Sequence, residues 1–349
     1  MKTDVQKKSS ENKKLKVKTN PKKERIAWID VAKGVTILTV IWSHTLPFGG
    51  LPRNLIFCFH MPLFFILSGF TLKPAKDVKD LVLRTKKDFI RLVVPAFLIV
   101  AIGGLLNVLI LNSRLSTEIS DCLYKLFWAN GVPLADGLPS MGMLWFLVSL
   151  FFAKLIMRTL SLLFKDGYEL IGILCGFVGL TLNVKHIWLP FNFDMALVCA
   201  MFVAGGILAC KYYETLVKYK PIIFIVSSIF VYQMLLGGKY IEFAGHSYDV
   251  FTILEGFAAS FIVCAICKSI ESINIIHKVF CFIGMNTMPI FLTHHLDGFI
   301  SFLFIRGNVY ISCILRTFYV LLFAFIFAFI YRWCKKKIIE HHARSILSN

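Results

Sequence analysis

Two apolar segments near the N-terminus constrain the fold more than any other feature. The stretch 28–74 contains two apolar runs of about 20 residues, joined by a short turn rich in Pro and Gly. Each run is long enough to cross a bilayer at about 1.5 Å per residue, which predicts a transmembrane hairpin. The first arm carries His44 and the second carries His60. Ionisable side chains at membrane depth are costly and usually face a protein interior or a watery cavity, so both are candidate functional residues.

The two histidines have similar predicted depths. Counted from the turn, their depths differ by roughly 6 Å, so both could line one cavity. Asp30 precedes His44 by 14 residues, about 21 Å along a helix, so a carboxylate that orients His44 must come from another helix. Each histidine also has a structural alternative. His44 would bond a neighbouring helix, and His60 would repair the kink that Pro62 introduces.

The composition of the whole chain extends this interpretation. Of 349 residues 57% are hydrophobic and the mean hydropathy is +0.73, which excludes a soluble globular protein. The net charge of +18 does not indicate nucleic-acid binding, because 30 Lys/Arg fall in predicted inner segments and six in outer ones. We therefore predict an all-α polytopic protein of the plasma membrane, with about ten transmembrane helices and both termini cytoplasmic. One of these helices is expected over 279–304.

Three regions are predicted. Residues 1–25 carry ten Lys/Arg and form a disordered cytoplasmic tail near lipid headgroups, 26–334 form the transmembrane domain, and 335–349 form a basic cytoplasmic tail. The ten cysteines lack the spacing of a disulfide framework, and no metal site is expected. We find no internal repeat, no phosphate-binding loop and no nucleophile elbow.

Short motifs follow the hairpin in a characteristic order. They are Ile29-Asp30, Lys33-Gly34 and His44, then Phe59-His60-Met61-Pro62-Leu63-Phe64-Phe65 with Ser68-Gly69, and later Arg91-Leu92 with Pro95, Trp145-Phe146-Leu147, Phe193-Asp194, Gly284-Met285-Asn286-Thr287 and His294. The series resembles the integral-membrane acyltransferase type 3 family, and within it the branch similar to fucose 4-O-acetylase. The resemblance covers about residues 26–334, and the hairpin motif is its most specific part.

The resemblance implies an enzyme that moves an acyl group from cytoplasmic acyl-CoA to hydroxyls of a cell-surface polysaccharide or a lipid-linked glycan precursor. Acetyl is the expected group, acyl-CoA is a co-substrate, and no tightly bound cofactor is expected. Such transfer needs a base, which the resemblance assigns to His44, acting directly or through an acyl-imidazole. His60 and His294 are further catalytic candidates. His294 lies near the predicted depth of His44.

The remaining candidates are charged residues near the two membrane faces. Lys33, Arg84 and Arg91 would bind the phosphates of acyl-CoA at the inner face, although positive-inside topology also places cations there. Asp30 would pair with Lys33 or Arg91. At the outer face, Arg53 would hold the oxyanion or acceptor, with an interfacial arginine as its alternative.

Asp194 would bind sugar hydroxyls or orient an imidazole, with a helix N-cap as its alternative. The rival function for the whole chain is a non-enzymatic exporter or flippase of glycolipid precursors. In that case the buried histidines would relay protons. The absence of a detectable repeat speaks against a transporter.

Overall fold

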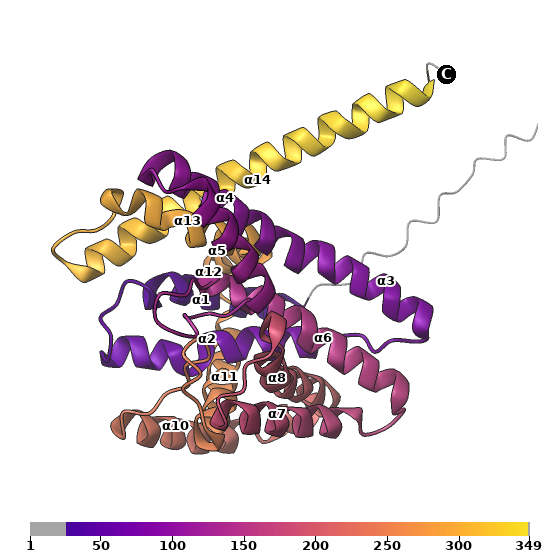
Figure 1. The fold of residues 1–349 in the computed structure, drawn as a ribbon. Coiled ribbons are helices and arrows are strands. Elements are labelled where there is room, and N and C mark those ends of the chain that lie inside the picture. The colour runs from indigo at the N-terminus through magenta and orange to yellow at the C-terminus, as the bar shows by residue number, and fades with distance from the viewer. Residues whose placement is uncertain (1–25, 348–349) are drawn as a thin grey trace, which may run out of the picture.

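The protein is built from helices. The computed structural model describes residues 26–347, and within this range the only β-type pairing is an isolated bridge between Glu242 and Ser247 (Figure 1). The expected N-terminal tail, 1–25, lies outside the described residues. The α-helices are α1 (Ala27–Ser43), α2 (Leu51–Phe70), α3 (Val78–Asp88), α4 (Val94–Leu111), α5 (Leu115–Trp128), α6 (Trp145–Leu163), α7 (Tyr168–Val184), α8 (Phe193–Lys211), α9 (Tyr213–Lys218), α10 (Lys220–Leu236), α11 (Val250–Ile270), α12 (Asn274–Met285), α13 (Thr287–Leu296) and α14 (Val309–Leu347).

Four short elements connect or extend these helices. They are a π-helical turn, η1 (Phe89–Val93), and three 3-10 turns, η2 (Gly142–Leu144), η3 (Pro190–Asn192) and η4 (Asp297–Leu303). Several helix ends follow directly from the sequence. Pro52 occupies the first turn of α2, where a missing N–H costs nothing. Asp249 and Thr252 form a capping box that starts α11, with both side chain to backbone bonds at 2.8 Å.

Small residues let four helices approach closely. A Cβ atom added to Gly69 of α2 would lie 2.0 Å from Val203 O, and one added to Gly206 of α8 would lie 2.0 Å from Ile66 O. Helices α1 and α12 cross in the same way, because a Cβ on Gly34 would lie 2.2 Å from Phe280 O. Membrane helices without a strong hydrophobic drive to associate use such small residues to bring backbones into contact. These crossings hold both arms of the N-terminal hairpin against later helices.

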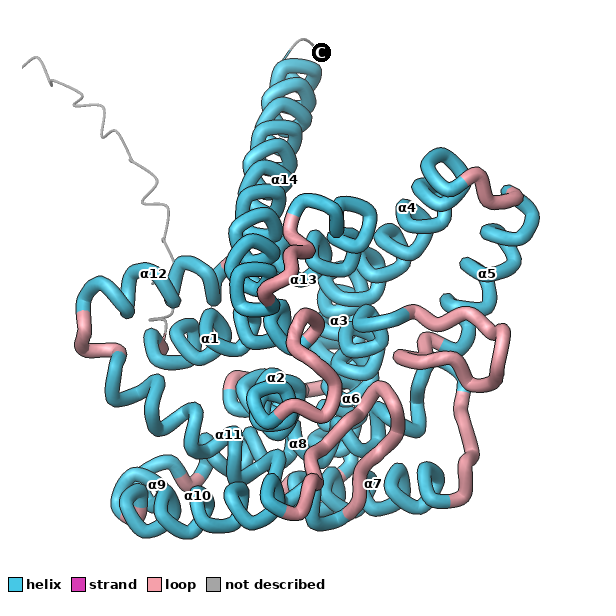
Figure 2. Tube along the Cα trace, turned by 90° about the vertical axis from the view of Figure 1, so that its left-hand side faces the viewer, coloured by secondary structure: helices cyan, strands magenta, loops and turns pink. Residues whose placement is uncertain are grey.

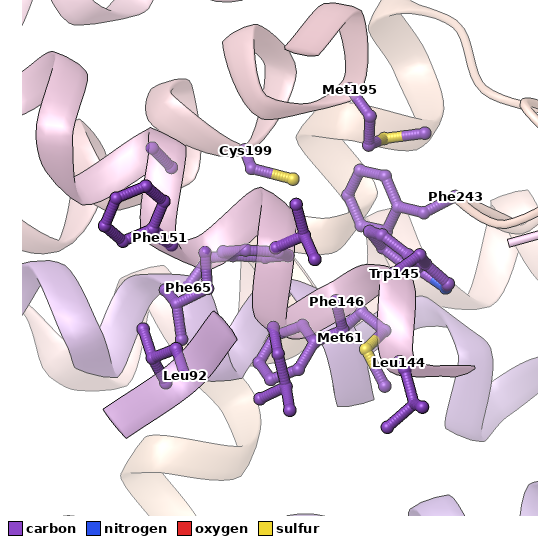
Figure 3. Packing of buried hydrophobic residues seen from close by; sticks show 14 of the residues in the cluster. Met61, Phe65, Leu92, Leu144, Trp145, Phe146, Phe151, Met195, Cys199 and Phe243 are labelled. Carbon is purple, nitrogen blue, oxygen red and sulfur yellow. The ribbon is translucent and has the colours of Figure 1, made fainter. Parts of the chain in front are cut away.

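An aromatic cluster fills the space beside the hairpin. Phe65 of α2 packs against Phe146 of α6 with ring centroids 5.0 Å apart, and Trp145 packs against Phe243 at 6.0 Å (Figure 3). Phe65 is fully buried, and Trp145 and Phe146 are also buried. The Trp145-Phe146-Leu147 motif therefore contributes to the core of the bundle.

The all-α multi-pass class is confirmed, but the count of about ten spans is not. Six helical segments in the described range are long and apolar enough to cross a membrane, or up to seven if one bent pair is a single span. Three further predicted spans, α1, α7 and α10, contain 17 residues each. A helix of that length rises about 26 Å, slightly less than the roughly 30 Å hydrocarbon core of a bilayer.

The continuous helix expected over 279–304 is wrong. The chain breaks at Asn286, and the segments on either side, α12 and α13 with η4, are bent by 65°. Pro289 explains the position of the break. It lacks the N–H that would bond to the carbonyl of Met285, and its ring would clash with that carbonyl in an unbroken helix. The bend gives α13 a direction independent of α12.

Helix α14 is longer than the span expected before the basic segment at 335–337. The part of the predicted C-terminal tail that is described, 335–347, continues α14 as helix. Figure 1 and Figure 2 show this end of α14 projecting away from the other helices. The first turns of α14, by contrast, pack against the bundle and bring Arg316 to the end of α1.

Candidate active site

Two histidines meet where α1 ends. His44 directly follows α1, and His294 lies in the last turn of α13. Their ring centroids are 5.4 Å apart with the ring planes at 61°, an edge-to-face contact. His44 is exposed, whereas His294 is only 1% exposed. The pair therefore has one histidine that a substrate can reach and one that is enclosed by protein.

A carboxylate orients the enclosed histidine. His294 Nδ1 lies 2.7 Å from Asp297 Oδ2, and Asp297 is also buried. Arg316 of α14 donates two hydrogen bonds to the same carboxylate, from Nε to Oδ2 and from Nη2 to Oδ1, both 2.7 Å long. A carboxylate held by a bidentate arginine can only accept hydrogen bonds, so His294 donates from Nδ1.

This assignment fixes the protonation of the other ring nitrogen of His294, Nε2. With its proton on Nδ1, a neutral imidazole carries an unshared electron pair on Nε2. His294 Nε2 is buried and has no hydrogen-bond partner among the described residues. A buried polar atom without a partner is unusual and marks a place where a proton or a polar group is accommodated during function. The His294 ring meets the ring of His44 in the edge-to-face contact described above.

Two arginines secure the backbone at the end of α1. Arg316 Nη1 donates to the carbonyl of His44 at 2.8 Å and to Thr45 Oγ1 at 3.1 Å. Arg53 of α2 donates from Nε to the carbonyl of Ser43 at 3.3 Å. The last carbonyls of a helix lack partners within the helix and carry partial negative charge, so cations are stabilising there. The two guanidinium groups thus fix the backbone from which the His44 ring projects.

Arg53 lies inside the protein rather than at its surface. Its guanidinium carbon lies 4.0 Å from the ring centroid of Phe48 and 4.1 Å from that of Phe57, and the residue is 4% exposed. Arg53 Nη2 is 3.9 Å from Glu242 Oε1, and Nη1 is buried without a partner among the described residues. Arg53 is therefore not an interfacial arginine whose guanidinium reaches into water.

His60 makes no direct contact with this pair, although it lies close enough to His44 to interact with it electrostatically. Its Nδ1 lies 2.9 Å from the carbonyl of Ile56, one helical turn earlier in α2, and its ring packs edge-on against Phe57 at 4.7 Å. The carbonyl that Pro62 leaves without an amide donor is that of Cys58, so the His60 bond does not replace the missing one. Within the described range no hydrogen bond or ring contact joins His60 to His44 or His294.

Asp194 lies in a second polar cluster. The residue is buried in the first turn of α8 and accepts the backbone N–H of Leu189 at 2.9 Å. Its other oxygen lies 4.0 Å from His246 Nδ1, in the loop between α10 and α11. Burial lowers the pKa of His246 to about 4, so this imidazole is neutral at pH 7. No described contact connects Asp194 to the His44 and His294 pair.

Of the predicted donor-site residues, Lys33 and its neighbour Asp30 lie in α1, Arg84 lies in α3 and Arg91 lies in η1. Asp30 Oδ1 is 3.6 Å from Lys33 Nζ, so Lys33 is the partner of Asp30. Arg84 Nε bonds Asp80 Oδ2 at 2.7 Å within α3. Arg91 is exposed and makes no ion pair within the described part of the chain. Among the described residues, Lys33 and Arg84 are therefore paired with carboxylates, whereas the Arg91 guanidinium is not.

Three charged residues beside Arg91 form a buried cluster that the sequence analysis did not single out. Asp88 accepts from Lys154 Nζ at 2.9 Å and from Arg158 Nη1 at 2.5 Å. Lys154 and Arg158 are one turn apart in α6, a spacing that places both on one helix face. Two cations at this spacing in an otherwise apolar helix are the sequence signal that could have indicated the cluster. Asp88, however, comes from α3, and its pairing is a tertiary contact.

Asp297 and Arg316 were also missed as site residues. Arg316 is the only cation in the first 22 residues of α14, a segment apolar enough to span a membrane. Asp297 follows His294 by three residues. Both facts fit the rule that ionisable residues at membrane depth pair with one another. What the sequence does not provide is the bend at Asn286, which turns α13 toward the start of α14.

The family comparison covers most of the chain. A family model described as an acyltransferase domain matches residues 26–333. No curated protein and no solved structure matches the chain. The chain belongs to the integral-membrane acyltransferase type 3 family and is a multi-pass membrane acyltransferase.

Proposed function

We propose that this protein is an O-acyltransferase that moves an acyl group, with acetyl as the expected one, from cytoplasmic acyl-CoA to hydroxyls of a cell-surface polysaccharide or a lipid-linked glycan precursor. The observation that carries the proposal is the arrangement of His44, His294, Asp297 and Arg316 at one end of α1. Similarity of the hairpin motif to the fucose 4-O-acetylase-like branch supports acetyl as the acyl group and a sugar hydroxyl as its acceptor.

His44 is the catalytic base in this proposal. It is the exposed member of the histidine pair, so a substrate hydroxyl can reach its ring. The acceptor oxygen attacks the thioester carbon as His44 removes the hydroxyl proton; a C–O bond forms and the C–S bond breaks. The proton then passes from His44 to the sulfur of the departing CoA thiolate. A positioned base of this kind typically accelerates a reaction by about 10²- to 10⁴-fold.

His294 acts through His44 rather than on the substrate. Its side chain is 0% exposed, so no substrate atom can touch it in this conformation. With Nδ1 donating to Asp297, its Nε2 can accept a hydrogen bond from an N–H of His44 and stabilise the positive charge that His44 acquires. Arg316 keeps Asp297 ionised and holds the His44 backbone. His294, Asp297 and Arg316 are therefore positioning residues.

The donor binds near the other end of α1. Acyl-CoA is a polyanion, and Arg91 presents a guanidinium that is not engaged by a carboxylate in the described structure. Arg91 binds phosphate oxygens in a bidentate fork, and Lys33 is the second cation proposed for the donor. Arg84 contributes less because Asp80 already engages it. Asp30 neutralises part of the Lys33 charge and does not contact the donor.

The acceptor binds beside His44. Arg53 lies next to the end of α1, and its contacts with Ser43 and the two phenylalanines favour a role in holding that end rather than in binding the oxyanion. Asp194 is buried against its own loop, which favours a role in anchoring the start of α8. His60 supports the hairpin and is a base candidate only if His44 proves dispensable.

The test compares surface glycans from cells with and without the protein. Solution NMR of the purified glycan should show that one O-acyl ester signal disappears in the deletion strain while the amount of glycan stays unchanged. Complementation with the His44→Ala variant at equal membrane abundance should not restore the signal. A fall in total glycan with an unchanged ester content per sugar would instead identify an exporter of glycolipid precursors.

A further inference from the structure

An apolar cavity lies away from the histidine pair. It has a volume of about 630 Å³ and is enclosed mainly by α8, α10 and α11, with Trp28 and Phe70 of the hairpin at one side. Ligand-binding cavities commonly measure about 300–1,000 Å³. None of the residues proposed above for acyl transfer lines it. The cavity therefore has the size of a ligand site and is not explained by the proposed reaction.

The cavity continues into a polar compartment. A second cavity of about 640 Å³ shares Trp28, Phe70, Tyr213 and Lys268 with the first. Its other lining residues include Lys211, Glu214 and Glu271. These residues lie at the end of the bundle where the basic segments gather, which the positive-inside rule assigns to the cytoplasm. An apolar cavity that opens into a charged compartment fits a ligand with an apolar chain and a charged group.

One buried hydroxyl beside the apolar cavity lacks a partner. Ser260 lies in the middle of α11, lines the cavity and is 1% exposed. Its Oγ has no hydrogen-bond partner among the described residues, although helix serines commonly bond to a carbonyl one turn earlier. The Oγ atom is enclosed by protein and does not face the cavity, so the charges at the cavity, and not this hydroxyl, indicate the ligand.

The charges at the cavity indicate the sign of the ligand. The apolar cavity has two charged lining residues, Lys220 and Lys268, and both are cationic. Lys220 Nζ donates to Ser269 Oγ at 3.0 Å and has no carboxylate partner within the described range. Lys268 is paired with Glu271, which lines only the polar compartment. An anionic phosphate between the two ammonium groups would complement the uncompensated charge of Lys220.

We propose that this cavity binds an anionic phospholipid from the adjacent leaflet. One acyl chain fills the space between α8, α10 and α11, and the phosphate contacts Lys220 and Lys268. The lipid stabilises the junction of these helices and takes no part in acyl transfer. The proposal is therefore independent of the proposed function.

Photo-crosslinking of the full chain in nanodiscs tests this site. The probe is a phosphatidylglycerol that carries a diazirine near the end of one acyl chain, and labelled peptides are identified by mass spectrometry. We expect labelling of peptides from α8 and α11. The Ala209→Phe variant, which places a ring in the cavity, should lose this labelling. The Lys220→Ala, Lys268→Ala double variant should require about 30-fold more probe for equal labelling. Each lysine near a membrane surface raises the affinity for anionic lipid by about fivefold, and the two factors multiply.

Controls separate the site from general lipid contact. Lys218→Ala removes the same charge from α9 without touching either cavity and should label as the unmodified protein does. A matching phosphatidylcholine probe should label weakly, and acetyl-CoA should not displace phosphatidylglycerol. Equal labelling of the unmodified protein and the lysine double variant would overturn the proposal. Displacement by acetyl-CoA would also overturn it and would make the cavity part of the donor site.

Discussion

Arg316 Nη1 donates to the backbone carbonyl of His44 at 2.8 Å, so the residue that holds Asp297 also holds the end of α1. Through this one side chain, the carboxylate that orients His294 and the backbone that presents His44 are parts of the same hydrogen-bonded unit. The unit joins α1, η4 and α14, which are far apart in the sequence.

Arg316→Lys should lower both stability and activity. Lysine keeps the charge, but a single ammonium cannot bond both oxygens of Asp297 and the His44 carbonyl with the same geometry. A hydrogen bond to a charged group typically contributes about 1.5–3 kcal/mol, so the loss of one or more of these bonds should lower the unfolding temperature of the purified protein. Arg306→Lys is the matched control, because Arg306 is exposed and bonds only carbonyls of its own loop. Equal unfolding temperatures for the two variants would mean that Arg316 does not hold the site together.

Asp297→Asn should reduce acylation while leaving the protein folded. An amide can donate to His294 Nδ1, which would move the ring proton to Nε2 and remove the acceptor that faces His44. Loss of the orienting carboxylate costs up to about 10⁴-fold in a serine protease triad, and we expect a loss of at least roughly 10²-fold here. Initial rates with saturating acetyl-CoA provide the measurement. Asp136→Asn, in an exposed loop, controls for the change from carboxylate to amide. A normal rate for Asp297→Asn would exclude the positioning role.

Arg91→Ala should weaken donor use more than acceptor use. The side chain is exposed and carries no ion pair in the described structure, so its removal deletes a phosphate contact without leaving a buried charge. The KM for acetyl-CoA should rise by about tenfold, the size of effect that one charge-assisted contact provides. Arg84→Ala is the comparison, since Asp80 already engages that guanidinium. If purified Arg91→Ala bound acetyl-CoA with unchanged affinity, the proposed donor site would be in the wrong place.

The alternation of basic segments predicts the orientation of the chain. Reporter fusions after Lys76, Lys165 and Lys218 should be cytoplasmic, and fusions after Ser120, Lys185 and His246 should be outside. Five of these positions lie at helix ends or in connecting segments, and Ser120 lies within α5. Two successive positions on the same side would show that the helix between them does not cross the membrane.

The sequence predicted most helices because their signal is local. The two apolar runs predicted within 28–74 are α1 and α2, and they are joined by a short turn as expected. Apolar length and turn residues are sufficient for such elements. The break at Asn286 was missed because an apolar stretch of 26 residues outweighed the effect of Pro289, although a proline inside a helix is a recognised cause of a kink.

The candidate site was only partly predictable for a different reason. His44 and His294 could be singled out because histidine is rare at membrane depth. The pairing of Asp297 with Arg316 could not be identified from the sequence. The two residues are 19 positions apart and meet only because the chain reverses between α13 and α14. Asp194 was predicted to bind sugar hydroxyls, to orient an imidazole or to cap a helix; the imidazole that lies near it, at 4.0 Å, is that of His246. Contacts between helices depend on packing that no local pattern encodes.

The His44→Gln variant tests the central claim most directly. Glutamine keeps the polarity and approximate size of histidine but cannot accept a proton at neutral pH, and His44 is exposed, so folding should not depend on it. The measurement is the rate of acetyl transfer from acetyl-CoA to the isolated glycan acceptor by protein at equal membrane abundance. We predict that His44→Gln is as inactive as His44→Ala, with a loss of about 10²- to 10⁴-fold. A His44→Gln rate close to that of the unmodified protein would contradict the assignment of His44 as the base.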